Sequence, residues 1–225
     1  AGGQALASLF ENNISELVLV GSIVKPELSE LRPDAWTTRF LAGNIYKLGD
    51  DNLLRRLVKH LEDKEGFRVL GVDELIPKLI TPARCLTRAS PSESDLVDIR
   101  AGVEAAKQLG HQDQGQGVIV DGGLILAKEG QSGTDAMIGT IPPLSIDQKP
   151  RGILVKVIKP EQERRVDLPT IGPETIDAAV RSGLRGISIE AGGSLILDKH
   201  ELIKRADSAG VFVVGTDPSL LEELT

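Results

Sequence analysis

Short runs of β-branched and other apolar residues alternate along the chain with longer amphipathic segments, and this alternation strongly constrains the fold. The runs include "ELVLVGS" from Glu16, "GILVKVIKP" from Gly152 and "VFVVG" from Val211. Apolar runs of this length that end near glycine are typical of buried strands in parallel sheets. The segments between them carry apolar residues at helical spacing. The sequence therefore predicts an α/β protein.

Helix boundaries are also visible. The stretch 50–66 predicts a helix that is capped by Asp50 or Asp51 and stopped by Gly66. A helix is expected to begin at Pro173, because proline suits the first helical turn, and another is expected over 199–210. A further capped helix over 92–110 is expected to end at Gly110 and to direct four apolar side chains inward: Leu96, Ile99, Val103 and Ala106.

The second half contains signals that the first half lacks. "GVIVDGGLILAKEG" predicts a hairpin around its Asp-Gly-Gly turn, and "GISIEAGGSLILD" predicts a second hairpin or paired strands. Lys156 and Lys159 are three apart, so they point to opposite faces of one strand unless Lys159 already lies in the next loop. The proline- and serine-rich stretch 77–94 predicts a boundary between domains at 1–82 and 83–225.

Composition excludes several classes of function. A chain of 225 residues with net charge −7 and six aromatic residues is a poor nucleic-acid binder, because such binders need a basic face or stacking platforms. A single cysteine, Cys85, excludes an intramolecular disulfide, and this suits a reducing cytoplasm. One cysteine and three scattered histidines also argue against a structural zinc site. The apolar runs are shorter than the roughly 18 residues of a membrane span, so we expect any membrane contact to be peripheral.

A local excess of cations stands against the acidic background. Residues 149–167 contain six Lys and Arg side chains and three acids. Cations around a carboxylate suit a pyrophosphate with Mg²⁺, because the cations neutralise phosphate oxygens while the acid binds the hard metal. A solvated charged loop explains the same pattern.

Glycine-rich loops are the other candidates. "DQGQG" (113–117) and "EGQSGTDAM" (129–137) flank the predicted hairpin, so their polar groups can converge at one end, although plain hairpin loops also have this composition. Gly2 and Gly3 resemble a phosphate-binding turn, but no strand precedes them here, and an ordinary terminus is the alternative. Gly21 and Ser22 follow a strand, where open α/β sheets bind ligands.

These segments together resemble a known family. "DQGQGVIV", "EGQSGTDAM", "KPEQERRVDLPTIGPETI" and "EAGG", in this order and spacing, are similar to the UDP-2,3-diacylglucosamine diphosphatases of the LpxI type, enzymes of bacterial lipid A synthesis. "RVDLPTIG" is a long and specific match, and the resemblance extends from Glu11 to the end of the chain.

The resemblance implies a fold and a reaction. It implies a Rossmann-like N-terminal domain and a mixed α/β C-terminal catalytic domain that close around a nucleotide-linked, diacylated glucosamine. It implies Mg²⁺-dependent cleavage of the pyrophosphate of UDP-2,3-diacylglucosamine to UMP and 2,3-diacylglucosamine 1-phosphate. The expected location is the cytoplasm, with peripheral contact at the inner membrane.

The resemblance also implies roles for individual residues. Asp167 matches the key catalytic aspartate, which would hold Mg²⁺ or orient the attacking water, while Lys156 and Arg165, together with Lys159, would stabilise pyrophosphate charge. The matching substrate-binding positions are Gly2, Gly3, Gly21, Ser22, Thr87, Gln114, Gln116, Gly133, Thr134, Asp135, Met137, Lys159 and Gln162.

The sequence departs from the family pattern in three places. Ser132 replaces a family carboxylate, which weakens a metal role at that position, and the stretch 139–152 is shorter than usual. A strand before the first glycines and a segment after Phe10 are missing, so we expect the first domain to be incomplete in this chain. A noncatalytic nucleotide-sugar binder is the alternative function. A nicotinamide-dependent oxidoreductase is disfavoured, because no complete G-x-G-x-x-G follows a strand.

Overall fold

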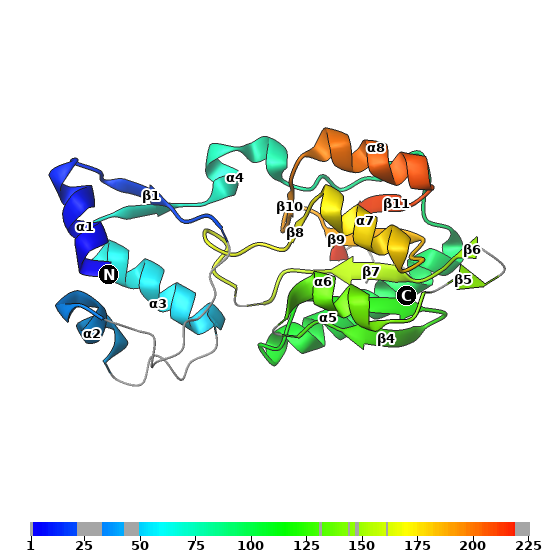
Figure 1. The fold of residues 1–225 in the computed structure, drawn as a ribbon, viewed down its shortest axis with the longest axis horizontal. Coiled ribbons are helices and arrows are strands. Elements are labelled where there is room, and N and C mark those ends of the chain that lie inside the picture. Colours follow the sequence, from blue (N-terminus) through cyan, green and yellow to red (C-terminus); the bar gives the residue numbers. More distant parts are fainter. Residues whose placement is uncertain are drawn as a thin grey trace. The chain divides into compact units, whose positions relative to one another are not determined.

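The chain is a mixed α/β protein that divides into two compact units (Figure 1). The computed structural model describes residues 2–21, 33–42, 50–130, 132–143, 145–146, 149–160 and 162–218. Unit 1 comprises Ala1–Pro77 and Glu163–Asp167, and unit 2 comprises Lys78–Gln162 and Leu168–Thr225. Five residues from the second half of the sequence thus belong to the first unit.

Unit 1 combines helices with a parallel strand pair. Strands β1 (Glu16–Val18) and β2 (Arg68–Leu70) pair in parallel, with Leu17 opposite Val69. The helices are α1 (Gly2–Glu11), α2 (Ala35–Leu41), α3 (Asp50–Asp63) and α4 (Val72–Leu75). The core consists of Leu6, Val58, Leu61, Phe67 and Val69. The Rossmann-like architecture of this half stays a prediction.

The predicted helix over 50–66 is confirmed, whereas the predicted burial of the first strand is wrong. Helix α3 is followed by Gly66, whose φ of 78° suits glycine; the side chains of Asp50 and Asp51 lie outside the described part. Strand β1 has Val18 38% exposed, and Val20 beyond it is 71% exposed. Within the described residues β1 pairs with β2, and alternate residues Leu17 and Leu19 pack on the core, so one face of the strand remains uncovered.

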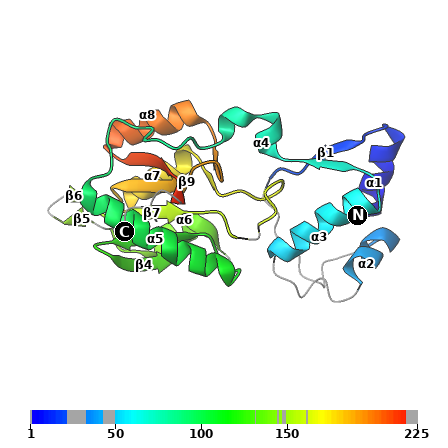
Figure 2. The same cartoon turned by 180° about the vertical axis from the view of Figure 1, so that it is seen from behind.

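Unit 2 is built on a mixed sheet with the strand order β11-β9-β7-β3-β4 in the described part of the chain (Figures 1 and 2). Strand β3 runs antiparallel to both β4 and β7, whereas β7, β9 and β11 are parallel to one another. The strands are β3 (Gly117–Asp121), β4 (Leu124–Lys128), β7 (Ile153–Lys156), β9 (Gly186–Glu190) and β11 (Phe212–Thr216). The hairpin predicted around Asp-Gly-Gly is confirmed as β3–β4.

Helices cover both faces of this sheet (Figure 2). Helix α5 packs on Val118 and Val120 of β3, while Ile119 between them faces the opposite core, which α6, α7 and α8 complete. This alternation follows from the two-residue period of a strand. The helices are α5 (Glu93–His111), α6 (Gly133–Thr140), α7 (Pro173–Arg181) and α8 (Lys199–Ala209), which confirms the predicted starts at 173 and 199.

Two details of the prediction for α5 are wrong. Leu96 is 40% exposed, because the inner side of the first turn is polar: Asp95 accepts the backbone N–H of the N-cap residue Ser92, and Asp98 accepts hydrogen bonds from the backbone of the hairpin turn. Gly110 does not stop the helix but lies buried in its last turn, where a Cβ would come 3.3 Å from Lys159 Cα.

The second predicted hairpin is also wrong. Strand β9 belongs to the main sheet, whereas β10 (Leu195–Ile196) pairs in parallel with β8 (Thr170–Ile171). The buried Ser194 hydroxyl donates to the carbonyl of Glu190, which folds the connection back on itself. The 3-10 helix η2 covers Pro77–Leu79, and β5 (Ser145–Ile146) pairs with β6 (Lys149–Pro150) as short antiparallel strands.

Candidate functional site

The register of the sheet brings the two glycine-rich loops to one edge of unit 2. Gly117 at the start of β3 is opposite Lys156 at the end of β7, and Val118 is opposite Lys128 at the end of β4. Because both neighbours run antiparallel to β3, the residue before β3 and the residues that end β4 and β7 meet. The predicted convergence of the two loops is therefore confirmed.

A buried carboxylate, Glu129, lies at the centre of this edge. The Gln116 N–H donates to Glu129 Oε2 at 2.9 Å, and the Thr134 hydroxyl donates to Glu129 Oε1. Lys156 Nζ donates to Thr134 Oγ1 at 2.6 Å and lies 3.9 Å from Glu129 Oε1. Glu129 and Lys156 are 7% and 5% exposed. The lysine, the hydroxyl and the carboxylate thus form one buried hydrogen-bonded chain.

The glycines of "DQGQG" allow this close approach. A Cβ on Gly115 would lie 2.5 Å from the carbonyl oxygen of Glu129, and one on Gly117 would lie 3.2 Å from Glu129 Oε2. Larger residues would therefore push the loop away from the carboxylate. The side-chain oxygen of Gln116 is buried without a hydrogen-bond partner among the described residues, so it remains an acceptor for a ligand or a water.

A second group of predicted residues follows β7, so Lys159 lies in the loop beyond the strand. The Lys159 N–H donates to Gln162 Oε1 at 3.0 Å, and its ammonium donates to Asp113 Oδ1 at 3.0 Å. The neighbouring Gln114 donates its backbone N–H to Leu109 at the end of α5. Asp113, the first residue of "DQGQG", and Lys159 of the cation-rich stretch are therefore held together.

Arg165 belongs to unit 1 and is held there by two carboxylates. Its Nε and Nη2 donate to the two oxygens of Glu163, each at 2.9 Å, and its Nη1 donates to Glu62 Oε1 on α3 at 2.7 Å. The Glu163 partner raises the pKa of Arg165, and the hydrogen bonds from Arg165 lower the pKa of Glu163. Val166 packs on the core of unit 1. The segment 163–167 is thus fixed by charge and by apolar contact.

Asp167 ends this segment. Its N–H donates to the carbonyl of Glu163 at 3.0 Å, which closes a turn, and the residue is half-buried. Among the described residues, no three His, Cys, Asp or Glu side chains gather as a metal cluster. Mg²⁺ usually retains waters and takes one or two carboxylates together with phosphate oxygens. The single carboxylate of Asp167 fits a Mg²⁺ of that kind, and its metal role stays a prediction.

The local excess of cations is divided among different partners. Lys156 pairs with Glu129, Lys159 with Asp113, Arg165 with Glu62 and Glu163, and Arg151 with Asp121 at the hairpin. Lys156 and Lys159 belong to unit 2, whereas Arg165 and Asp167 belong to unit 1. The positive charge that is concentrated in sequence is therefore largely matched by acids from elsewhere in the fold.

The first glycines are packed against α2. The Gly3 N–H donates to Asp34 Oδ2 at 2.7 Å, and a Cβ on Gly2 would lie 2.6 Å from the Trp36 ring. These contacts give the pair a structural role within unit 1. Gly21 has a φ of 108°, which favours glycine, and Ser22 lies outside the described residues.

The remaining predicted positions differ in exposure. Asp135 is exposed in the first turn of α6, where Gly133 has a φ of 79°. Met137 is 4% exposed in the core. The Thr87 hydroxyl donates to the Ala89 carbonyl and accepts the N–H of Val213, so it joins the segment after the boundary to β11.

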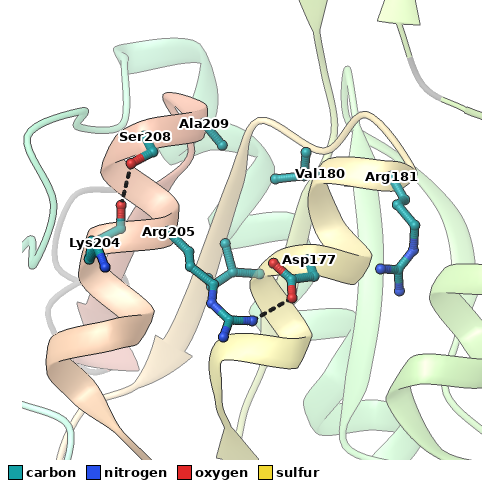
Figure 3. A pocket seen from close by; sticks show the side chains of 8 residues that line it. Asp177, Val180, Arg181, Lys204, Arg205, Ser208 and Ala209 are labelled. Atoms are coloured by element: carbon teal, nitrogen blue, oxygen red, sulfur yellow. Dashed lines mark hydrogen bonds and ion pairs between the residues drawn. The ribbon is translucent and has the colours of Figure 1, made fainter.

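A surface hollow of about 510 Å³ lies elsewhere, between α7 and α8 (Figure 3). Asp177 and Arg205 form an ion pair across it, and the carbonyl of Lys204 accepts the Ser208 hydroxyl. None of its lining residues is a predicted site residue. Its carboxylate is already bound by an arginine, so the hollow is a less suitable site than the edge around Glu129.

Sequence reasoning missed two acids that organise the predicted residues. Glu129 lies within the quoted glycine-rich stretch, directly after an alternating strand, so its position at a strand end was an available signal. In the sequence Glu62 is one of several charged residues on the polar face of α3. Its contact with Arg165 joins residues that are 103 positions apart, so the local sequence pattern does not indicate this contact.

The fold is that of a two-domain α/β protein, and each unit carries part of the predicted charged site. Comparisons with known proteins identify its family. Residues 1–79 match the LpxI N-terminal domain, and residues 82–214 match the LpxI C-terminal domain. The chain is 40% identical over 223 residues to the UDP-2,3-diacylglucosamine pyrophosphatase LpxI of Caulobacter vibrioides, which covers 96% of this chain and 79% of that protein. The chain belongs to the LpxI family. The helices within the described residues are too short or too polar to cross a membrane.

Proposed function

We propose that the protein hydrolyses the pyrophosphate of UDP-2,3-diacylglucosamine to UMP and 2,3-diacylglucosamine 1-phosphate, as a step in lipid A synthesis. The observation that carries this proposal is the match to both LpxI domains together with a 40% identical relative that is named for this reaction. The converging loops around Glu129 support it, because they gather a lysine, a hydroxyl and an amide at one sheet edge. A Rossmann-like first domain, a cytoplasmic location and peripheral contact with the inner membrane are parts of the same proposal.

In this proposal the chain's own residues bind the diphosphate and direct water to it. The carboxylate of Asp167 accepts a hydrogen bond from the attacking water and so orients it. The short turn that Asp167 forms with Glu163 limits the positions that this carboxylate can reach. Lys156, Lys159 and Arg165 contribute positive charge toward the developing phosphate charge, and their own carboxylate partners fix their positions beforehand. When bound, Mg²⁺ would neutralise phosphate oxygens beside the carboxylate of Asp167.

The substitution Asp167→Asn tests the role of the carboxylate. Because the amide keeps the size of the side chain but loses its charge, we expect turnover to fall by a factor of roughly 10² or more while substrate still binds. UMP release is measured with and without Mg²⁺, and binding is measured separately. Asp63→Asn, an exposed position at the end of α3 in the same unit, is the matched control and should keep its activity.

Each outcome has a distinct meaning. Near-normal turnover in Asp167→Asn would remove Asp167 from the catalytic role. Absence of Mg²⁺-dependent UMP release by the unaltered protein would refute the hydrolase proposal. Tight binding of UDP-2,3-diacylglucosamine without any turnover would instead identify a nucleotide-sugar binding protein.

A further inference from the structure

The buried Glu129 links three separate segments of unit 2. One carboxylate oxygen binds the backbone N–H of Gln116 in the loop before β3, and the other binds the hydroxyl of Thr134 in α6. Through that hydroxyl and by its charge it also holds the ammonium of Lys156 at the end of β7. Burial of a carboxylate is unfavourable unless it is paired and hydrogen-bonded, and both of these oxygens have partners.

We propose that Glu129 is a positioning residue of the LpxI site, which fixes the Thr134 hydroxyl and the Lys156 ammonium. This inference rests on the proposed hydrolytic function and adds a residue to it. Glu129 acts through the residues it holds, so it is not itself a catalytic residue. Gly117 leaves room for the Glu129 carboxylate, and Gly115 leaves room for the backbone carbonyl and Cβ of Glu129.

The chain of hydrogen bonds also fixes the direction of the Thr134 hydroxyl. A threonine hydroxyl has one proton and two lone pairs. Here the proton goes to Glu129 Oε1, and one lone pair accepts from Lys156 Nζ. The remaining lone pair accepts from an O–H or N–H group of a ligand, so Thr134 does not donate to a phosphate oxygen while its hydroxyl donates to Glu129. Phosphate contact at this edge is then left to cationic and backbone donors.

Variants with different effects on this chain test the proposal. Glu129→Gln removes the charge, Glu129→Asp keeps the charge but shortens the side chain by one methylene, and Thr134→Val removes the hydroxyl at nearly constant volume. Because displacement of reacting groups by about 1 Å is expected to cost up to 10²-fold, we expect each variant to lose roughly 10- to 100-fold in kcat with a change in KM below about threefold. Glu104→Gln, an exposed carboxylate on α5, is the control and should keep both constants.

Combined variants separate positioning from general destabilisation. Glu129 and Thr134 belong to the same chain of hydrogen bonds. The double variant Glu129→Gln with Thr134→Val should therefore have a kcat no lower than that of the less active single variant. Urea unfolding followed by far-UV circular dichroism measures folding independently. Glu129→Gln leaves the ammonium buried without its countercharge, so its urea midpoint should fall further than that of Glu129→Gln combined with Lys156→Met.

The outcomes decide the proposal. Normal kcat in folded Thr134→Val and Glu129→Asp would overturn it, as would kcat losses that multiply in the double variant. If the unaltered protein released no UMP, the proposed function would fail, and affinity for UDP-2,3-diacylglucosamine would replace kcat as the measurement. Weaker binding by Thr134→Val with an unchanged urea midpoint would then support positioning, and unchanged binding would overturn it.

Discussion

Gly102 provides a quantitative test of how closely α5 approaches the sheet. It is buried on α5, and a Cβ at this position would lie 2.6 Å from Val155 Cγ2 on β7 and 2.9 Å from Val120 Cγ2 on β3. Carbon atoms normally approach to about 3.5–4.0 Å, so the added methyl group overlaps Val155 by about 1 Å. Both valines are 0% exposed and have little room to move. We therefore expect Gly102→Ala to destabilise the protein.

The size of the effect follows from two opposing contributions. Overpacking of a close-packed core costs about 1–3 kcal/mol, and the rigid neighbours place this site near the upper end. Replacement of glycine by alanine inside a helix contributes about 1 kcal/mol in the opposite direction. The net loss is about 1–2 kcal/mol, which corresponds to a melting temperature lower by roughly 3–6 °C for a chain of this size.

Thermal unfolding followed by far-UV circular dichroism measures this effect. Gly139→Ala on α6 is the matched control, because no heavy atom lies within 4 Å of its new Cβ, and its melting temperature should stay equal or rise. Val155→Ala removes the methyl group that clashes, so its combination with Gly102→Ala should be less destabilising than the sum of the two single changes. A melting temperature of Gly102→Ala as high as that of Gly139→Ala would show that α5 does not lie this close to β7.

Two further predictions concern other parts of the chain. The pKa of the Glu163 carboxyl is lowered from 4.5, chiefly by the side-chain hydrogen bonds of Arg165, so its stabilising contribution is present above about pH 4.5 and is lost as the pH falls through the lower folded value. The urea midpoint of unfolding, followed by the fluorescence of Trp36 in unit 1, should therefore fall as the solution is made acidic. Arg165→Gln should make this fall in the urea midpoint smaller. An equal fall in both proteins would contradict the argument. Gly122→Ala at the hairpin, where φ is 57°, should cost about 1–2 kcal/mol by circular dichroism, and unchanged stability would argue against a left-handed turn there.

The sequence predicts elements well where short-range chemistry determines them. Proline at position 173 and the Asp-Gly-Gly turn define local backbone geometry, and the structure confirms both the helix and the hairpin. The partner of a strand depends on distant residues, so β10, which follows β9 closely, pairs instead with β8. For the same reason Leu96 was assigned to the wrong face, because Asp95 and Asp98 have partners far away in sequence.

The candidate site shows the same limit. The two glycine-rich loops were expected to converge because they flank one hairpin, and a hairpin brings its two ends together. The roles of Asp167 and the cations came from the family resemblance, since charge alone fits a solvated loop equally well. Glu62 became visible only through its contact with Arg165, whereas for Glu129 the position at a strand end was a sequence signal and only its partners Thr134 and Lys156 required the structure.

The placement of Glu163–Asp167 in unit 1 affects how the protein is divided experimentally. A gene fragment that ends at residue 77 encodes the first unit without the turn that brings Val166 to its core and Arg165 to Glu62. A chimaera with a related enzyme that is joined only between residues 77 and 82 combines one parent's α3 with the other parent's turn. Exchange of a complete first unit between relatives therefore requires two coding segments, the second of which encodes five residues that include Asp167.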